Sequence, residues 1–550
     1  MRLPRIPDRH RTLVLLLLLA LALRVAWWTF YVDIIENEGV EYARLAWNLF
    51  HGRGYVGIFG GTHTHFPPFY PLLIGLVAPV AGSEEAAARL ISLLAGVATV
   101  GAIYHLARRI FDDRVAWLAG ALVACHPLLV ALSVTTYTEG LFLALSSGCA
   151  LATVSWIATP SPWRAIAVGA LAGFSYLTRP EGIALAAAFG GLLVLAGGLR
   201  HHAWRTGLAH ASLIALVAAL IASPYVAYLS RLAGGFRWEG KSAHNAIQAG
   251  RMAEGMTLNE ASRGLTPEGT AAGPSLIASQ DSVLSIPASR HGGLRFLMRD
   301  PVERFEEIGL GIVRAGFLGA PMLLLLGLSG ILLTQWWRNR LLEALALLAL
   351  PVLGFLVLLA VRWTWPRYFF PLLPGSLVWA AAGADRIAQL VVSGSARIGL
   401  PARLHPAARA SMAVVLALSV LVLAARDTTS VADLSQTRNG DLRAAGQWIR
   451  GDYLAAGEGD SPPLIASLGV ALAYYAGGEV VYLPFADEPR ALRFLHAAAP
   501  DYLAIRDSEL ARIPFAQDWF DGRVGDACIH PVTTLPPAAA SHVRIWRWTC

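Results

Sequence analysis

Residues 33–71 read DIIENEGVEYARLAWNLFHGRGYVGIFGGTHTHFPPFYP and follow the first long apolar run of the chain. This stretch gathers Glu36, Glu38 and Glu41, whereas the other hydrophobic segments carry almost no acid. Between residues 38 and 50 the apolar residues recur at helical spacing, and Glu38 and Glu41, three residues apart, share another face. The pattern predicts a short amphipathic helix on a membrane surface that displays carboxylates at its start. The alternative is an acidic face that is merely solvated.

The segment after this predicted helix is rich in glycine and closes with two histidines and two prolines, at Gly52, Gly54, Gly60, Gly61, His63, His65, Pro67 and Pro68. Glycine permits tight turns, so we expect the segment to fold back over the carboxylates and form a pocket at the bilayer edge, with Tyr42, His63 and His65 in its wall. The two histidines could bind a divalent metal, but histidines at this spacing in a glycine loop more often pack or hydrogen-bond. We therefore predict no metal and no other cofactor.

Hydrophobic residues make up 55% of the 550 residues, charged residues only 15%, and the mean hydropathy is +0.52. This composition excludes a soluble enzyme and indicates a multi-pass α-helical membrane protein. The net charge of +7 comes almost wholly from arginine, since Lys241 is the only lysine. Most arginines stand in short gaps between apolar runs, where charge sets membrane orientation, so we expect no nucleic-acid partner. Four cysteines exclude a disulfide-rich scaffold and offer no paired metal-ligand spacing.

The apolar runs predict about eleven spans, judged against the roughly 20 residues that a helix needs to cross a bilayer. The first, at 13–31, follows several arginines; a cleaved signal peptide is the alternative, but no small-residue cleavage site is present. The run at 69–80 is too short to cross and is predicted to be a re-entrant or interfacial helix. Further spans are predicted at 86–107, 115–132, 138–157, 164–179, 182–199, 206–228, 308–335, 341–361, 367–390 and 411–425.

The distribution of charge predicts an orientation. If the N-terminus is cytoplasmic and the spans alternate in direction, most arginines near span ends lie on the cytoplasmic side, as the positive-inside rule expects. These are Arg108, Arg109, Arg114, Arg164, Arg200, Arg205, Arg338, Arg340, Arg397, Arg403 and Arg409. Glu36, Glu38, Glu41, Glu139 and Glu181 all fall on the opposite side. Ionisable groups near span ends are costly unless they serve a function, so we expect the outer face to be the working face.

Two domains are predicted. Residues 1–426 form the transmembrane domain, with a first outer loop at 32–85 and a long outer loop at 231–307. The long loop is rich in Gly, Ser and Ala, so only partial order is expected unless a ligand or the membrane surface holds it.

Residues 427–550 are predicted to form a small extracytoplasmic α/β domain. Helical and strand-like patterns alternate there, with helices at 441–455 and about 488–498, strands at LIASL from 464, VVYLP from 480 and YLAI from 502, and a closing hairpin near the C-terminus. No phosphate-binding loop or nucleophile motif accompanies them. Packing or acceptor recognition is therefore the expected role of this domain.

Three short motifs place charged residues at outer span ends: YTEGLFLAL with Glu139, LTRPEGI with Arg179 and Glu181, and WTWPRYFFPLLPG with Arg367. Each alone fits a snorkelling or aromatic-belt residue that fixes the depth of a helix. Taken together, the arginines offer fixed donors to a phosphate, and the carboxylates offer bases. A lipid whose phosphate is handled at the outer leaflet would need this combination.

Several motifs recur in a fixed order along roughly residues 10–425: Glu41 and Tyr42 with Ala46, Leu49 and the run 52–55, then FPPFYPLL, AARL around Arg89, TRPEG and PRYFFPLLP. This order resembles that of the GT-C membrane glycosyltransferases, and most closely the protein O-mannosyltransferase and aminoarabinose-transferase-like family. The resemblance implies a GT-C fold in a bacterial-type plasma (inner) membrane. It also implies transfer of a sugar from a polyprenyl-phosphate donor to a glycan, lipid or protein acceptor at the outer face.

The resemblance further implies that an acidic residue of the first outer loop is the catalytic base. The family usually has an Asp, often Asp-Glu, about four residues before the loop tyrosine; here Glu38 stands four before Tyr42 and follows Asn37. This departure leaves Glu36, Glu38 and Glu41 as candidates, of which we favour Glu38.

One carboxylate that deprotonates the acceptor hydroxyl in a single step suffices, and such a reaction inverts the anomeric centre. The departing phosphate gains charge, which Arg367, Arg179 or Lys241 would stabilise in a poorly hydrated site. The expected substrate pocket also includes Arg89, together with the carboxylates Glu139 and Glu181.

Two other functional classes fit parts of the sequence. A transporter or lipid flippase would place ionisable residues near mid-span on broken helices and often shows repeated halves, and neither feature is evident. A non-catalytic membrane scaffold that presents the last domain would need neither an acidic loop nor arginines at span ends.

The four cysteines divide by position. Cys125 and Cys149 fall in predicted spans and should remain reduced as small apolar residues. Cys528 and Cys550 flank two strand-like runs, HPVTTL and HVRIWRW, separated by the turn segment PPAAAS. If these runs pair antiparallel, the two cysteines come within reach of a disulfide, and an extracytoplasmic domain provides the oxidising compartment. Two free thiols are the alternative.

Overall fold

The computed structural model describes residues 8–199, 204–278, 306, 308–309, 320–360, 366–395, 404–426, 440–457, 461–534 and 543–550. Arg200, Arg397, Arg403, most of the predicted second half of the long loop and the turn between the last two strands lie outside these residues. The chain divides into two compact units. Unit 1 comprises Met1–Val32, Arg89–Pro224 and Asp300–Ser435, and unit 2 comprises Asp33–Ala88, Tyr225–Arg299 and Gln436–Cys550.

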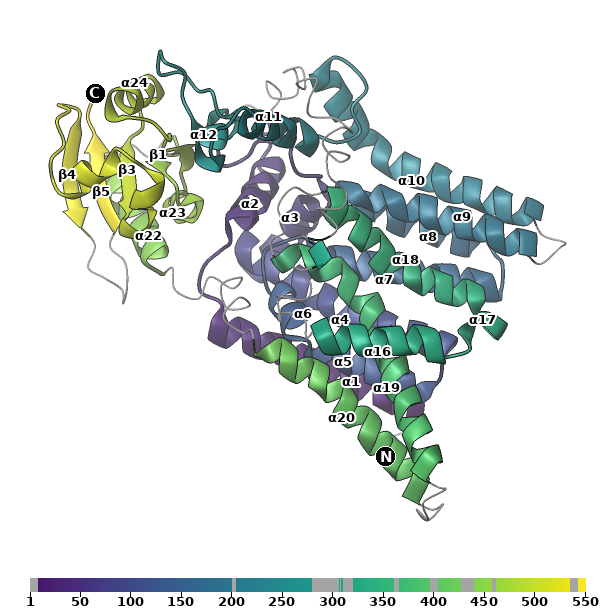
Figure 1. Cartoon of the computed structure of the whole chain (residues 1–550). Coiled ribbons are helices and arrows are strands. Elements are labelled where there is room, and N and C mark those ends of the chain that lie inside the picture. Colours follow the sequence, from purple (N-terminus) through teal and green to yellow (C-terminus); the bar gives the residue numbers. More distant parts are fainter. Residues whose placement is uncertain are drawn as a thin grey trace, which may run out of the picture. The chain divides into compact units, whose positions relative to one another are not determined.

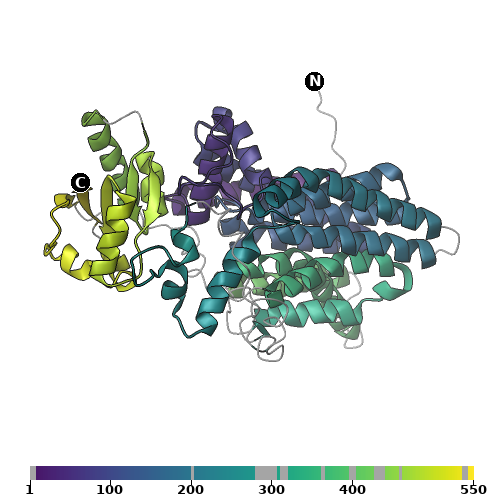
Figure 2. The same cartoon turned by 90° about the horizontal axis from the view of Figure 1, so that it is seen from above.

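Unit 1 is a helical bundle (Figure 1). Its described helices are α1 (Asp8–Tyr31), most of α4 (Glu84–Ile110), α5 (Asp113–Cys125), α6 (Pro127–Leu132), α7 (Glu139–Ala158), α8 (Pro162–Tyr176), η1 (Pro180–Gly182), α9 (Ile183–Leu199), most of α10 (Trp204–Ala233), α16 (Ala320–Leu333), α17 (Trp336–Asn339), α18 (Leu341–Ala360), η3 (Pro366–Leu372), α19 (Leu373–Ser395) and α20 (His405–Ala425). Helices α8, α9 and α10 run side by side in both views (Figures 1 and 2). Small residues permit this close packing, since Gly169 and Gly173 of α8 lie directly against α10.

Seven helices in the part of the chain that the structure describes are long and apolar enough to cross a membrane: α1, α4, α7, α9 with η1, α10, α18 and α20. Large apolar side chains on them face outward, among them Leu15, Leu18, Leu216, Leu220 and Val415. An apolar exterior of this extent identifies a multi-pass membrane protein. Each of the eleven predicted spans contains a helix, but α8 and α16 have only 15 and 14 residues. The predicted number of spans is therefore not confirmed.

The predicted span 115–132 is broken, because α5 ends at Cys125 and α6 begins at Pro127. Proline disfavours a helical residue before it, and His126 is extended, with φ −64° and ψ 121°. A break at membrane depth leaves carbonyl groups that need donors. The guanidinium of Arg24, buried in α1, donates to the carbonyl oxygens of Ala124 at 3.2 Å and Ala20 at 3.1 Å. Arg24 thus compensates for the break.

Unit 2 contains a five-stranded sheet in the order β2-β1-β3-β5-β4. Strands β1 (Leu464–Ser467), β2 (Glu479–Tyr482) and β3 (Tyr502–Arg506) are parallel, whereas β4 (Ile529–Thr534) and β5 (Val543–Trp548) form an antiparallel pair, with β5 beside β3. The remaining helices of the unit are α2 (Asn37–Phe50), α3 (Phe69–Ala81), α11 (Lys241–Ala253), α12 (Leu258–Arg263), η2 (Pro274–Leu276), α22 (Gly440–Ala455), α23 (Val470–Ala476), α24 (Glu488–Ala498), η6 (Asp507–Arg512) and α25 (Ala516–Phe520).

Side chains alternate across the sheet, as strand geometry requires. Tyr502 and Ala504 belong to a core shared with α22, α23 and α2, while Leu503 and Ile505 belong to a second core shared with α24 and α25. Helices therefore cover both faces of the sheet (Figure 1). The helices and strands predicted from residue 441 onward, and the short helix predicted at 69–80, are all present within two residues of their expected positions.

The division into units differs from the predicted boundary near residue 426. We call residues 440–550, which contain the sheet and helices α22 to α25, the sheet domain. The first loop is attached to this domain, since Val480 N donates to Ile58 O at 3.0 Å and Arg44 Nη2 donates to Gly478 O at 2.7 Å. The segment after α10 is attached as well, because Arg263 of α12 donates to Leu483 O at 2.8 Å. Its described part up to residue 278 holds the α-helices α11 and α12 and the short 3-10 helix η2, so more of this loop is folded than its composition indicates.

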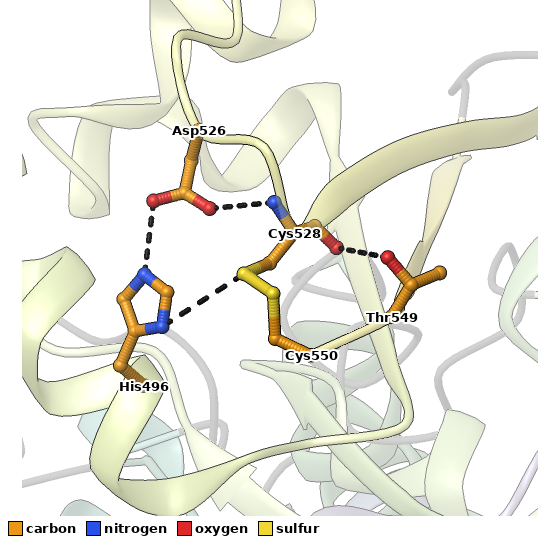
Figure 3. The surroundings of a disulfide bond; sticks show 5 residues. All are labelled: His496, Asp526, Cys528, Thr549 and Cys550. Carbon is orange, nitrogen blue, oxygen red and sulfur yellow. Dashed lines mark hydrogen bonds and ion pairs between the residues drawn. A yellow bond between two sulfur atoms is a disulfide. The ribbon is translucent and has the colours of Figure 1, made fainter.

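The C-terminus is joined to the start of β4. Cys528 and Cys550 form a disulfide with a Cα–Cα distance of 5.2 Å. Figure 3 shows His496 and Asp526 beside it, with His496 Nε2 2.9 Å from Asp526 Oδ2 and Nδ1 4.0 Å from Cys528 Sγ. Among the described residues, only His496, Asp526 and Cys528 gather as a group that could hold a metal ion. The sulfur of Cys528 is bonded to Cys550, so it supplies no thiolate for a metal.

Candidate functional site

Helix α2 is more deeply buried than its sequence pattern predicts. Glu36 precedes it as the N-cap residue and is fully buried, Glu41 is buried within it, and Glu38 is half-buried. Val40 and Ala43 pack into the core below α22 and α23. The expectation of a helix that displays all its carboxylates is therefore wrong. The sheet domain, which the local pattern does not reveal, covers one side of α2.

The glycine-rich segment folds back over Glu41, as expected, but it encloses that carboxylate rather than leaving it open. Glu41 Oε2 accepts a hydrogen bond from Ile58 N at 2.9 Å, and His63 Nδ1 lies 4.0 Å away. A Cβ atom at Gly57 would lie only 2.5 Å from Glu41 Oε2, so a larger residue there would displace this carboxylate. Burial raises the pKa of Glu41 to about 7, although the Ile58 bond and Arg44 oppose the rise.

His63 holds the loop together. Its Nε2 accepts a hydrogen bond from Phe66 N at 3.0 Å, and its carbonyl oxygen accepts one from the Tyr228 hydroxyl at 2.9 Å. Burial lowers the pKa of His63 to about 3, so the ring is neutral with its proton on Nδ1. The nitrogen that a metal would need is already used, and this geometry gives His63 a structural role. Tyr42 is also structural, since its ring packs between Phe66 at 4.7 Å and Tyr70 at 5.3 Å.

The start of α11 brings Lys241 to this loop. Lys241 Nζ lies 5.9 Å from the centre of the Phe66 ring, and the rings of His65 and His244 are 5.3 Å apart. Burial, and then the charge of Lys241, lower the pKa of both histidines, that of His244 to about 4. Gly240 lies so close to the Thr64 carbonyl that it has no room for a side chain. Three of the residues predicted for the site, His63, His65 and Lys241, therefore do meet in unit 2.

Among the three acidic candidates, Glu38 alone retains partial exposure. Glu36 and Glu41 are enclosed by the fold of unit 2, and Glu41 is committed to a backbone amide. A general base must reach the proton that it removes. Accessibility therefore favours Glu38.

A second charged cluster lies in unit 1 and combines the three motifs at the predicted span ends. Glu139 begins α7, Arg179 precedes η1, and Arg367 lies in η3. Arg179 Nη1 is 3.2 Å from Glu139 Oε1, Arg179 Nε is 2.5 Å from Glu181 Oε1, and Arg367 Nη1 is 3.9 Å from Glu139 Oε1. These four residues, which come from three distant stretches of the sequence, therefore form one network whose formal charges cancel.

Aromatic rings enclose this network. The guanidinium carbon of Arg367 lies 4.4 Å from the Tyr137 ring centre, and that of Arg179 lies 5.3 Å from the Phe370 ring centre. Glu139 is 1% exposed, and its Oε2 atom has no hydrogen-bond partner among the residues that the structure describes. A buried acceptor with open capacity, next to two guanidinium groups, is suited to a polar ligand.

Arg89 does not belong to this network. It is 1% exposed, and its Nη1 donates to Val134 O at 2.9 Å, so it ties α4 to the segment after α6. Three further residues beside these groups were not predicted from the sequence. Tyr137 immediately precedes the Glu139 motif, His244 lies in the segment that contains Lys241, and Tyr228 lies near the end of the span 206–228. An aromatic or imidazole ring next to a charged motif was the available signal.

Comparison with known proteins identifies the fold. The family model described as dolichyl-phosphate-mannose-protein mannosyltransferase matches residues 65–228. No curated protein sequence matches the chain. The structure is similar to ArnT from Cupriavidus metallidurans bound to undecaprenyl phosphate, with a TM-score of 0.54 and 14% identity over 97% of each chain.

It is also similar to the archaeal oligosaccharyltransferase AglB from Archaeoglobus fulgidus in complex with an inhibitory peptide and a dolichol-phosphate. The TM-score is 0.60 at 15% identity, and the alignment covers 92% of this chain and 70% of AglB. Identities this low show the fold alone, but both proteins and the matching family are of the GT-C type. The chain therefore has the fold of the GT-C membrane glycosyltransferases, and its residues 65–228 match a family of that type.

Proposed function

We propose that the protein transfers a sugar from a polyprenyl-phosphate donor to a hydroxyl acceptor. The observation that carries the proposal is the network of Arg179 and Arg367 with Glu139, because it gathers two guanidinium groups in a poorly hydrated part of a membrane-spanning unit. Guanidinium groups bind phosphate with matched geometry. The similar structures of ArnT and AglB hold undecaprenyl phosphate and a dolichol-phosphate, respectively.

In this reaction the acceptor oxygen attacks the anomeric carbon while the bond from that carbon to the phosphate oxygen breaks. The electron pair of the broken bond leaves with the polyprenyl phosphate, whose added charge Arg367 and Arg179 would stabilise. The proton of the acceptor hydroxyl passes to a carboxylate, for which we propose Glu38 because it is the most accessible of the three candidates. One displacement inverts the anomeric centre.

The charge distribution supports a multi-pass orientation in a bacterial-type plasma membrane with a cytoplasmic N-terminus and the sheet domain outside. Lys241, at the start of α11, is proposed as a further cation for the donor phosphate. No metal is required, because the leaving group is already a phosphate ester and the counter-charges are arginines.

The proposal is tested by incubating purified protein with a panel of polyprenyl-phosphate hexoses and pentoses and following release of free polyprenyl phosphate. Release that depends on both protein and acceptor is expected for at least one donor. The same incubation with Arg179→Ala protein is the matched control, since that change removes a proposed phosphate donor. Absence of release for every donor, with protein that still binds polyprenyl phosphate, would contradict transfer.

A further inference from the structure

A cavity of about 570 Å³ opens in unit 2 on the side of α2 away from Glu38. Trp47 lines it. Glu38 and Trp47 are nine positions apart, which is two and a half turns at about 3.6 residues per turn, so the two side chains lie on opposite sides of the helix. The cavity is lined by α2, the start of α4, α22, the segment before β1, and α23. Its volume falls within the roughly 300–1,000 Å³ of small-ligand pockets.

The lining combines aromatic surface with unused polar groups. Trp47 and Tyr453 form parts of the wall. His51 stacks on the Trp47 ring at 4.3 Å and the Arg53 guanidinium carbon lies 4.8 Å from the ring centre, and both hold the indole in place. The Tyr474 hydroxyl, the Glu84 carboxylate and the Arg450 guanidinium also line the cavity. Within the described part of the chain, none of these three groups makes a hydrogen bond. They are therefore available to a ligand as donors and acceptors.

Charges around the cavity nearly balance. Arg44, Arg53 and Arg450 line it together with Glu84 and Glu85. Two neighbouring groups outside the lining add one charge of each sign: the Glu479 carboxylate, which interacts with Arg44 and Arg53, and the Arg443 guanidinium, 3.7 Å from Glu85. The formal charge is therefore +1. A site for a polyphosphate or another polyanion would carry an excess of positive charge. An excess of only one positive charge favours an uncharged ligand with many hydroxyl groups, because each hydroxyl both donates and accepts.

We propose that this cavity binds a neutral saccharide. The C–H faces of sugar rings would pack on the aromatic wall, and their hydroxyl groups would bond to Tyr474, Glu84 and Arg450. Because the cavity and Glu38 lie on opposite sides of α2, this is a second carbohydrate site, apart from the attacking hydroxyl. The proposal rests on the proposed function only in taking the saccharide to be a non-reacting part of the acceptor.

The test measures binding of neutral mono- to tetrasaccharides, built from common hexoses and N-acetylhexosamines, to the purified full-length protein by saturation-transfer NMR, with no donor present. Two variants remove single groups and keep shape: Glu84→Gln and Tyr474→Phe. Gln517→Ala, on the exposed surface of α25 and outside the cavity lining, is the matched control. Phosphorylated and sulfated sugars test the opposite charge preference.

At least one neutral saccharide is expected to bind, with affinity reduced about tenfold or more by Glu84→Gln, less by Tyr474→Phe, and unchanged by Gln517→Ala. Absence of binding by every neutral sugar, binding that both cavity variants leave unchanged, or preference for the anionic sugars would each overturn the proposal. Since no donor is present, failure here leaves the transfer reaction untouched, and failure of transfer leaves the binding result valid.

Discussion

The carboxylates of the two units are held in different ways. In unit 2, Glu41 is buried against a backbone amide, and its pKa rises to about 7 because desolvation outweighs the amide and Arg44. In unit 1, Glu139 is buried to a similar extent but contacts two guanidinium groups. The comparison indicates that burial favours the protonated form of Glu41 in unit 2, whereas unit 1 holds a neutral ion-pair network suited to fixing a charged group.

The largest effect on transfer is expected for Glu38→Gln, which keeps the shape of the side chain and removes the base. Loss of a general base typically lowers the rate by about 10² to 10⁴. The decrease is measured as the turnover number of the purified variant. Glu36→Gln and Glu41→Gln, which alter buried carboxylates of the same segment, are the controls. If Glu38→Gln keeps near-normal turnover and one of the controls loses activity, the residue changed in that control is the base. If all three variants are active, the loop takes no part in catalysis.

A smaller effect, on donor affinity rather than on the chemical step, is expected in unit 1. Arg367→Ala should raise the Kd for a polyprenyl-phosphate sugar about 10- to 100-fold, since hydrogen bonds to charged groups contribute roughly 1.5–3 kcal/mol. Arg367→Lys keeps the charge but loses the planar fork, so it should be impaired rather than neutral. Arg89→Lys, which alters a buried arginine outside the network, is the control. Wild-type affinity of Arg367→Ala would reduce Arg367 to an aromatic-belt residue.

Glu41→Gln should change transfer little but should change how stability depends on pH. The folded-state pKa of about 7 lies above the ordinary value of 4.5, so the folded protein binds the proton more tightly. The contribution of this group to the free energy of unfolding is fully present below about pH 4.5 and is lost as the pH rises toward 7. At about 1.4 kcal/mol per pKa unit, the loss is of the order of a few kcal/mol. Thermal unfolding in detergent across this range should show a falling Tm for wild type.

The Tm of Glu41→Gln should fall less than that of wild type over the same pH range, because the amide does not titrate. An equal fall in both proteins would show that other groups cause it and that the Glu41 carboxylate is not buried as described.

The smallest effect on transfer is expected from the sheet domain. Cys550→Ser should leave turnover within about twofold, since the disulfide lies at the sheet edge, yet it should lower the stability of the domain by about 3 kcal/mol for a loop of this length. Mass spectrometry of protein alkylated without reductant checks the bond itself. Full alkylation of Cys528 and Cys550 would show two free thiols, and labelling from the cytoplasmic side would overturn the orientation.

Local patterns were sufficient for many of the elements. The apolar runs predicted a helix in every span, and alternation with turn residues predicted the strands and helices after residue 441. Long-range packing was not accessible in this way. Glu38 and Glu41 share a helix face, yet only Glu41 is enclosed, because Ile58 returns over it. Periodicity reports which residues share a face but not what covers that face.

The charged motifs also show that local sequence does not reveal long-range contacts. Each of Glu139, Arg179 and Arg367 was equally consistent with an isolated residue that sets helix depth, and only the packing of α7, η1 and η3 brings them within 4 Å of one another in pairs. The break at His126 was signalled by Pro127, but the run of apolar residues on both sides outweighed that signal. Its compensation by Arg24 depends on a contact across 100 residues of sequence.

We propose that binding of the donor phosphate and removal of the acceptor proton depend on separate side chains. The most direct measurement is a single-turnover experiment on a radiolabelled polyprenyl-phosphate sugar, which yields the donor Kd and the rate of polyprenyl phosphate release for the same protein. We expect Glu38→Gln to bind donor with wild-type Kd but to release product at least about 100-fold more slowly, whereas Arg367→Ala should bind donor weakly and, once saturated, lose less rate. Weakened donor binding in Glu38→Gln with normal release from the bound complex would contradict it.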